Sequence, residues 1–342
     1  MKLYFASDYQ EGALPEIVDA LVESNMIPSP GYGSDDYCAR ARQLIRNACQ
    51  CPEAEVHFLV GGTQTNQVMI DTALRPWQGV IAAQTGHISS HEAGAIEFTG
   101  HKVLELPQTL GKLNAQQIRE YAATYWSDGN CEHIVAPGMV YLSQPTEYGT
   151  LYTLEELTAI RSVCDEFGML LYIDGARLAY GLVCPENDVT LADLARLCHI
   201  FYIGGTKCGA LFGEAVVISQ PNLIPHLFSM IKQHGALLAK GRLLGLQFET
   251  LFRDSLYTRA AENAICAANR LRTHLKEKGY QFFFETPTNQ IFIVMENEAL
   301  ARLGEKVVYS FWEKYDDTHT VIRLATSWAT TEENLEKLLQ LL

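Results

Sequence analysis

The sequence lacks the features that mark several large classes of protein. Its nine cysteines are an odd number with no C-x-x-C pair, and several lie inside apolar runs, which favours buried reduced thiols over a disulfide framework. No apolar run approaches the about 18 residues that a membrane-spanning helix needs. Asp8 and Glu11 come too early for the apolar core of a secretion signal. These absences predict a soluble cytoplasmic protein.

Positive charge is also scarce. The chain has 26 Lys and Arg against 40 Asp and Glu, a formal net charge of −14. This balance excludes nucleic acid and an anionic membrane surface as the main partner, and it leaves room for a local basic site that binds a small anion. With 48% hydrophobic residues among 342, the chain can bury a large core, and its length suits one large domain and a small one.

Between about residues 55 and 220, short apolar runs alternate with helix-like stretches. Most runs are nearly continuous in β-branched and aromatic residues, which is typical of strands buried on both faces. This alternation predicts an α/β fold with a doubly wound, mostly parallel seven-stranded sheet. The expected strands are 55–62, 79–84, 101–107, 138–144, 169–175, 199–205 and 214–219.

The remaining pattern predicts helices with clear ends and a second, smaller domain. The segments 153–156 (TLEE) and 330–333 (TTEE) predict capping boxes, and Gly168 predicts the end of the helix that follows the first of them. Residues 221–277 read as long helices, and short strands return after Gly279. We therefore expect a large domain over 1–249, including the N-terminal segment, and a small α+β domain over 250–342. The absence of repeats and Pro-rich linkers predicts that they pack closely.

The turn after the first expected strand has the composition of an anion-binding site. Gly61, Gly62 and Thr63 lie where that strand passes into a helix, so backbone N–H groups and a hydroxyl are available at the helix N-terminus. In a parallel sheet, ligands collect beyond the carboxyl ends of the strands. Glycines at such turns are often needed only for the tight backbone geometry. The segment therefore indicates an anion site only in combination with the segments that follow the other strands.

Three further strand ends carry reactive side chains. Asp174 ends a buried strand and needs a partner, which a cationic ring nitrogen or Arg177 could provide. Lys207 follows another buried strand in a Gly-rich turn, a position suited to a lowered pKa and Schiff-base chemistry. His87 and His91 are four residues apart, but no third ligand is suggested nearby, so we expect no metal site.

Taken in chain order, these segments resemble the fold-type-I enzymes that use pyridoxal 5'-phosphate. The similarity is greatest to the threonine aldolase group of the β-eliminating lyases, and it extends over nearly the whole chain. Its most specific part is the D-G-A-R segment at 174–177 ahead of T-K-x-G at 206–209. The other matching segments are Ser7-Asp8, Gly31-Tyr32-Gly33, Gly61 to Asn66, His87 with Glu92-Ala93-Gly94, and Arg323 in IRLATSW.

The resemblance implies a role for each matching residue in holding the cofactor. Lys207 would form the Schiff base and shuttle protons, Asp174 would keep the ring nitrogen protonated, and His87 would stack on the ring. Gly62, Thr63 and Thr206 would hold the phosphate. Tyr32 and a basic residue, best matched by Lys240 and less well by Arg242, would reach the phosphate of a neighbouring subunit. The last pairing implies a homodimer or a homotetramer.

The resemblance also implies the reaction. Ser7, Arg177 and Arg323 would hold the substrate carboxylate, with guanidinium groups suited to bidentate pairing. An amino acid such as L-threonine or L-allo-threonine would then be cleaved between Cα and Cβ to glycine and an aldehyde, a retro-aldol reaction.

The sequence departs from the family pattern around the substrate. Glu147 stands where a histidine is frequent, so the proton of the β-hydroxyl could pass to His91, to His87 or to Glu147 itself. The alternatives are a β-eliminating lyase, an aldolase for a bulkier hydroxy amino acid, and a non-catalytic paralogue that keeps the cofactor pocket. The intact Lys207 and Asp174 argue against a non-catalytic protein, and a metal-dependent hydrolase lacks a third ligand.

Overall fold

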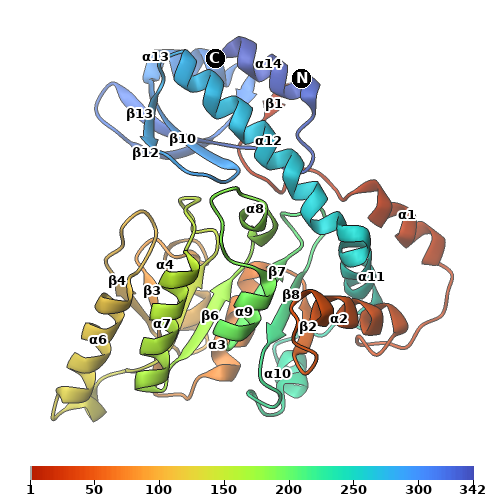
Figure 1. Ribbon diagram of the computed structural model, residues 1–342, viewed down its shortest axis with the longest axis vertical. Helices are drawn as coiled ribbons and strands as arrows, with labels where there is room; N and C mark the ends of the chain where they lie inside the picture. Colours follow the sequence, from red (N-terminus) through yellow and green to blue (C-terminus); the bar gives the residue numbers. More distant parts are fainter. Residues whose placement is uncertain (1) are drawn as a thin grey trace.

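The computed structural model describes residues 2–342, which form two parts built around separate sheets (Figure 1). In the larger part the strand order is β2-β8-β7-β6-β5-β3-β4, and only β8 runs antiparallel to its neighbours. The predicted seven-stranded, mostly parallel sheet is therefore confirmed. Its strands are β2 (Glu55–Leu59), β3 (Gln78–Ala83), β4 (Val103–Leu106), β5 (Ala136–Ser143), β6 (Leu170–Asp174), β7 (Ile200–Gly204) and β8 (Glu214–Ile218).

Helices cover both faces of this sheet because both faces are apolar. One face packs against α2 (Asp36–Ala48), α6 (Ala115–Ser127), α7 (Leu154–Phe167), α8 (Leu178–Leu182), α9 (Leu191–Leu197) and α11 (Arg242–Phe252). The other face packs against α3 (Gly62–Ala73), α4 (His87–Ser90), α5 (Ala95–Phe98) and α10 (Leu227–Gln233). The large part thus has the doubly wound layers that the alternating pattern predicts.

The helix signals were read correctly in some places and wrongly in others. Thr153 caps α7 in a full capping box, and Gly168 ends that helix with a φ of 65°. The second predicted capping box is wrong. The N-cap of α14 (Glu332–Leu341) is Thr331, and the third residue of the helix is Asn334 rather than the Glu or Gln that a capping box requires. The long helical stretch 221–277 is broken after α10, where Gly235 has a φ of 66° that favours glycine.

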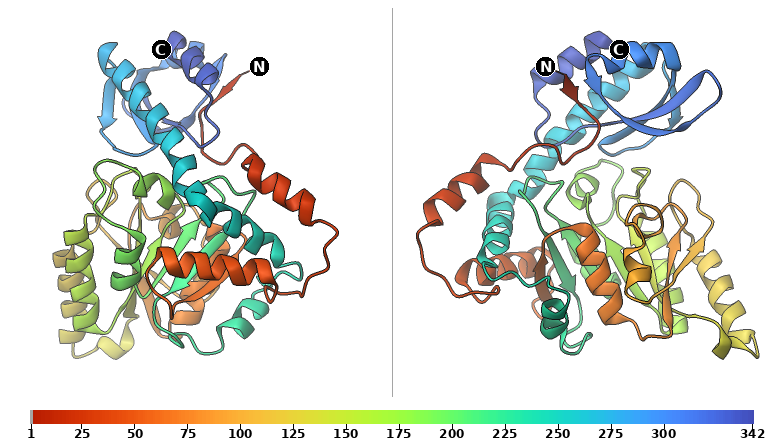
Figure 2. Two further views of the ribbon diagram at one scale, coloured as in Figure 1. Left: turned by 45° about the vertical axis from the view of Figure 1, so that its right-hand side comes forward. Right: turned by 180° about the vertical axis from the view of Figure 1, so that it is seen from behind.

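The smaller part is an antiparallel sheet packed on helices. Its strand order is β12-β13-β10-β9, and α12 (Leu256–Glu277) runs from the large part to this sheet (Figure 1). The N-terminal strand β1 (Leu3–Tyr4) pairs with β11 (Val307–Val308), so both chain ends lie in this part (Figure 2). The domain boundary at 249/250 stays a prediction.

The remaining elements are distributed over both parts. The strands of the smaller sheet are β9 (Gln281–Phe284), β10 (Gln290–Glu296), β12 (Ser310–Lys314) and β13 (His319–Ala325). The other helices are α1 (Pro15–Ser24), α13 (Asn297–Gly304), η1 (Cys131–His133) and η2 (Arg253–Ser255).

Three observations concern disulfide-bonded, membrane-spanning and metal-binding proteins, the classes that the sequence argued against. All nine cysteines have free thiols, and six of them are buried. Over residues 2–342, no helix combines the length and the apolar character needed to cross a bilayer. The same residues contain no group of three His, Cys, Asp or Glu side chains arranged to hold a metal ion.

Acid stability is expected to depend on His199, which precedes β7. Its Nδ1 accepts a hydrogen bond from the backbone N–H of Leu171 (2.9 Å), and burial lowers its pKa from 6.5 to about 4. Because the folded pKa lies below the unfolded one, this contribution is complete above pH 6.5 and is lost as the pH falls toward 4. The corresponding loss in the free energy of unfolding is about 3 kcal/mol.

Urea unfolding at several pH values measures this effect. In His199→Asn the amide oxygen still accepts the Leu171 N–H, but the side chain does not titrate. The variant should therefore lose less stability than the parent between the two pKa values. An equal loss in both proteins would show that other groups govern acid unfolding.

Candidate active site

A cavity of about 680 Å³ lies at the carboxyl ends of the parallel strands, between the two sheets. The small part contributes Ser310, Phe311 and Trp312 of β12 and Arg323 of β13 to its wall. Most of the site residues predicted from the sequence lie together here, and they are Gly62, Thr63, His87, His91, Asp174, Arg177, Thr206, Lys207 and Arg323. Ser7, Tyr32 and Lys240 are not among the lining residues.

Asp174 is held as a carboxylate at the end of β6. It is 4% exposed, and its two oxygens accept hydrogen bonds from the hydroxyls of Tyr141 (2.6 Å) and Tyr202, the amide of Asn66 (3.1 Å) and the N–H of Ala176 (3.0 Å). Burial alone would raise its pKa, but His87 and these donors lower it. The sheet thus presents a fixed negative charge to the cavity.

Lys207 supplies an amine beside that carboxylate. Burial and the positive charge of Arg177 lower its pKa, and the attraction of Asp8 and Asp174 only partly opposes them. Its Nζ lies 5.8 Å from the centre of the Tyr9 ring and makes no hydrogen bond to another residue within 2–342. A larger share of this amine is therefore neutral at pH 7 than for an ordinary lysine, which makes it more nucleophilic.

The N-terminus of α3 faces the same cavity. Gly61 precedes the helix in an extended conformation, no side chain caps it, and Gly62 and Thr63 line the cavity. Nearby, Thr206 shows an unexpected arrangement. Its hydroxyl donates to Glu214 (2.8 Å) and accepts from the N–H of Gly213 (3.0 Å), so its hydrogen is already engaged. The uncapped helix end offers the free N–H groups for an anion.

A buried polar network joins His87 to Asp174. His87 Nδ1 lies 2.6 Å from Glu92 Oε1, and the Asn66 amide donates to both Glu92 (2.7 Å) and Asp174 (3.1 Å). The hydroxyl of Tyr172 donates to the oxygen of Asn66 (2.8 Å). Sequence reasoning gave Asn66 and Glu92 no role. The only signal was their place in the matching segments, since the contacts of Asn66 join residues 26 or more apart.

His91 and Glu147 flank His87 from two sides. The rings of His87 and His91 are stacked with centres 5.8 Å apart, and burial and then the neighbouring His87 lower the pKa of His91. Glu147 accepts hydrogen bonds from the His87 N–H (3.0 Å) and the Ser143 hydroxyl (2.7 Å). Burial raises the pKa of Glu147. The lowered pKa of His91 favours its neutral imidazole, while the raised pKa of Glu147 favours the protonated carboxyl over the carboxylate.

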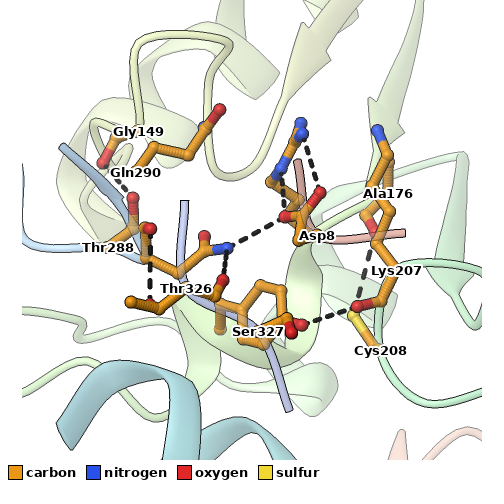
Figure 3. Close-up of polar contacts among 12 residues, drawn as sticks. Asp8, Gly149, Ala176, Lys207, Cys208, Thr288, Gln290, Thr326 and Ser327 are labelled. Atoms are coloured by element: carbon orange, nitrogen blue, oxygen red, sulfur yellow. Dashed lines mark hydrogen bonds and ion pairs between the residues drawn. The ribbon is translucent and has the colours of Figure 1, made fainter. Parts of the chain in front are cut away.

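The two arginines differ from the expectation that both are open to a substrate. Arg177 already binds Asp8 through Nε (2.7 Å) and Nη2 (3.0 Å), and Asn289 also donates to Asp8 (2.9 Å). Burial would raise the pKa of Asp8, but the charges of Arg177 and Lys207 and the hydrogen bonds from Arg177 and Asn289 lower it to about 2. Figure 3 shows Asp8 between Lys207 on one side and Gln290 and Thr326 of the smaller part on the other. Sequence reasoning placed Ser7 at the substrate and missed this partner.

Arg323 is the more open of the two. It donates to the side chain of Gln290 (2.9 Å) and the carbonyl of Ala6 (3.0 Å), both neutral, and its buried Nε has no partner among the described residues. Burial and the charge of Arg177 lower its pKa to about 10. A desolvated cation without a counter-ion favours a bound anion, and a guanidinium suits a carboxylate.

These residues fit pyridoxal phosphate in three separate respects. A fixed carboxylate suits a protonated ring nitrogen, an amine of lowered pKa suits an aldehyde carbon, and an uncapped helix N-terminus suits a phosphate. All three face one cavity on a mostly parallel sheet with a small antiparallel sheet above it. The molecule is a fold-type-I enzyme of the pyridoxal-phosphate class.

Comparison with known proteins defines the family. The model of the beta-eliminating lyase family matches residues 5–298, and the chain belongs to this family. A low specificity L-threonine aldolase from a Pseudomonas species is 31% identical, over 98% of this chain and 95% of its own length. The solved structure of a Leishmania major threonine aldolase is 44% identical, has a TM-score of 0.95 and covers 98% of this chain and 97% of its own.

A more distant neighbour shows how far the fold extends. An aspartate aminotransferase from Thermus thermophilus has a TM-score of 0.70 at 16% identity, covering 99% of this chain and 90% of its own. At that identity the likeness concerns the fold alone. The predicted fold class and the predicted family are both confirmed.

Proposed function

We propose that the protein cleaves L-threonine, L-allo-threonine or a related β-hydroxy-α-amino acid to glycine and an aldehyde. The observation that carries this proposal is Arg323, a partly buried cation in the cavity that holds Lys207 and Asp174, whose buried Nε has no partner within residues 2–342. It offers a carboxylate site beside a reactive amine, which is what an α-amino acid substrate requires. The aldolase names of the Pseudomonas and Leishmania relatives support the same reaction.

The cofactor would be held by residues from four strand ends. Pyridoxal phosphate, when bound, supplies an aldehyde that joins amines and a ring that accepts the electron pair of a bond breaking at Cα. Asp174 would hold a proton on the ring nitrogen, and Lys207 would provide the amine. The N–H groups of Gly62 and Thr63, with Thr206 after its hydroxyl turns, would bind the phosphate. His87, fixed by Glu92, would lie against the ring.

The substrate would be oriented by charge and deprotonated by a neutral base. Arg323 would bind its carboxylate, with Ser7 and Arg177 beside it. The Nη1 of Arg177 has no hydrogen-bond partner within residues 2–342, and Asp8 would keep the guanidinium in place through Nε and Nη2. Holding the carboxylate fixes which bond of Cα stands perpendicular to the ring, and here that bond must be Cα–Cβ. His91 would accept the proton of the β-hydroxyl, because its lowered pKa leaves it neutral at pH 7.

The reaction itself is tested with purified protein and pyridoxal phosphate. L-threonine is expected to yield glycine and acetaldehyde in equal amounts. A visible absorption band should appear on adding the cofactor, and borohydride should remove it by reducing the bond to Lys207. Formation of 2-oxobutyrate and ammonia in place of glycine would instead establish an eliminating lyase.

Replacing His91 by phenylalanine should slow cleavage by about 10²-fold, the usual contribution of a general base. Phenylalanine keeps the stacked ring beside His87 but accepts no proton. Glu147→Gln should have the smaller effect, because Gln still accepts hydrogen bonds from His87 and Ser143. Steady-state kcat on L-threonine and L-allo-threonine measures both variants, with cofactor binding as the control. Full kcat of His91→Phe on both substrates would assign the proton to His87, Glu147 or water.

A bulkier hydroxy amino acid is a second candidate substrate. The aromatic side chains of Tyr148, Phe311 and Trp312 line the cavity wall that faces away from the sheet, and Phe311 is 65% exposed. Such a wall favours an apolar group on Cβ. Comparing kcat/KM for L-threonine and for its analogue with a phenyl group on Cβ separates the two candidates.

The site also supports our proposal of a homodimer or homotetramer. The N–H of Tyr32 donates to the carbonyl of Ala239 (3.1 Å), which places Tyr32 beside Lys240 and outside the cavity that contains Lys207. Arg242 is engaged with the carbonyls of Ser24 and Ile27, which leaves Lys240 as the better candidate. These two residues would complete a neighbour's phosphate site, and sedimentation measures the assembly.

We also propose that the protein is located in the cytoplasm. The free thiols of all nine cysteines favour a reducing compartment.

A further inference from the structure

Three consecutive polar side chains of the smaller part, Thr288, Asn289 and Gln290, are completely buried (Figure 3). They form the end of the turn before β10 and the first residue of that strand. The hydroxyl of Thr288 donates to the carbonyl of Gly149 (2.9 Å), and the amide of Asn289 donates to the carboxylate of Asp8 (2.9 Å). Contacts across 139 and 281 positions of sequence therefore hold this segment in place.

Gln290 uses both ends of its amide group. Its Oε1 accepts a hydrogen bond from Nη1 of Arg323 (2.9 Å), and its Nε2 donates to the backbone carbonyl of Glu147 in the larger part (3.4 Å). Arg323 and Glu147 line the cavity, whereas Gln290 is not among the lining residues. The amide of Gln290 thus lies behind the cavity wall and acts on the cavity through Arg323.

A neutral partner leaves the positive charge of Arg323 available. The other hydrogen bond of this guanidinium goes to the carbonyl of Ala6 (3.0 Å), and its Nε has no partner within residues 2–342. The carboxylate of Asp8 is bound on both oxygens by Arg177. An amide at position 290 fixes the direction of the Arg323 guanidinium, whereas a carboxylate there would also form an ion pair with it.

We propose that Gln290 is a positioning residue for the substrate carboxylate: it orients the Arg323 guanidinium and leaves its charge for the substrate. Thr288 and Asn289 are anchored by their own hydrogen bonds, and consecutive Cα atoms are about 3.8 Å apart, so Gln290 has little freedom to move. It thereby fixes Arg323 relative to Arg177. The inference rests on the proposed function, in which the two arginines hold the carboxylate of an amino acid.

The main experiment is the steady-state kinetics of Gln290→Glu. This variant keeps the size of the side chain and an acceptor for Arg323, and the guanidinium in direct contact favours the ionised carboxylate. The new carboxylate then competes with the substrate for Arg323. KM for L-threonine is expected to rise about 10-fold, the effect of losing one hydrogen bond to a charged group, while kcat changes much less. An unchanged KM would overturn the inference.

Gln290→Met is a second variant in case Gln290→Glu does not fold. Methionine has a similar length but leaves Nη1 of Arg323 without its acceptor, so the guanidinium is free to turn. KM should rise, by less than in Gln290→Glu, because no competing charge is added. If Gln290 only supported the packing, both variants would lower the melting temperature and keep the parental KM, which would contradict the proposal.

Gln247→Glu is the matched control. Gln247 is a completely buried glutamine on α11, and its amide hydrogen-bonds to the backbone N–H of Leu211 (2.8 Å) and the carbonyl of Leu243 (2.9 Å). None of these three residues lines the cavity. The control therefore adds the same buried carboxyl group away from Arg323, and its KM should equal that of the parent.

A binding measurement separates this inference from the proposed reaction. N-acetylglycine carries the carboxylate of an α-amino acid, but its amide nitrogen does not join the cofactor. It should raise the melting temperature of the protein with bound pyridoxal phosphate, and Gln290→Glu should need about 10-fold more of it for the same rise. Binding to the parent without threonine cleavage would refute the proposed function alone. No rise in the parent, or equal binding to both proteins, would overturn the inference.

Discussion

Lys207→Ala is expected to reduce threonine cleavage by at least about 10³-fold, since it removes both the amine that joins the cofactor and a proton carrier. The fold should be retained, because Lys207 makes no side-chain hydrogen bond to other described residues and its charge is buried near Arg177. Acetaldehyde release measures the activity, and far-ultraviolet circular dichroism measures the fold. The visible cofactor band that borohydride removes should also disappear.

The control for this variant is Lys278→Ala. Lys278 is exposed just after α12, far along the chain from the cavity residues, and its loss should leave kcat unchanged. Threonine cleavage at the parental rate by Lys207→Ala would refute the role of this lysine. A visible band that is still present in the variant and is removed by borohydride would indicate a different lysine as the site of attachment.

Asp174→Asn is expected to lower kcat by about 10²-fold or more, because a neutral side chain does not keep the ring nitrogen protonated. The substitution also has a structural cost. The carboxylate accepts hydrogen bonds on both oxygens, and an amide group has only one acceptor, so donors such as Tyr141 or Tyr202 lose a partner. A buried donor without a partner costs about 1–3 kcal/mol, and the melting temperature should therefore fall.

Tyr141→Phe separates the charge effect from the structural one. It removes one hydrogen bond to Asp174 and leaves the carboxylate in place, so stability should fall by about 1 kcal/mol while kcat changes less than about tenfold. The visible spectrum of the bound cofactor provides a readout other than activity. An Asp174→Asn protein with parental kcat and spectrum would show that this carboxylate does not act on the ring.

Local sequence signals were sufficient for the elements of the sheet, and they gave the ends of its strands to within three residues. The apolar runs that include Tyr141, Tyr172 and Tyr202 could be predicted as strands, because short, continuous runs of β-branched and aromatic residues are typical of strands that are buried on both faces of a sheet. The chemistry at strand ends followed from the same signals, since the ends of parallel strands meet at one edge. Asp174 and Lys207 could therefore be selected before their distance was known.

Contacts between segments far apart in the chain were beyond these signals. Asp8 binds Arg177 across 169 residues, and this pair depends on β1 joining the small part rather than the large sheet. The N-cap of α14 was also misread, because Thr330 and Thr331 both satisfy the local pattern and packing selects Thr331. The break in the helical stretch after α10 was missed as well.

The sequence by itself determined the class of sheet and the order of the candidate site residues along the chain, because each depends on a local run of residue types. Only the tertiary structure decided which charges meet. It paired Arg177 with Asp8 and left Arg323 with neutral partners. The reason is physical: protonation and ion pairing depend on burial and on distances of a few ångströms, and these arise only when separate segments pack together.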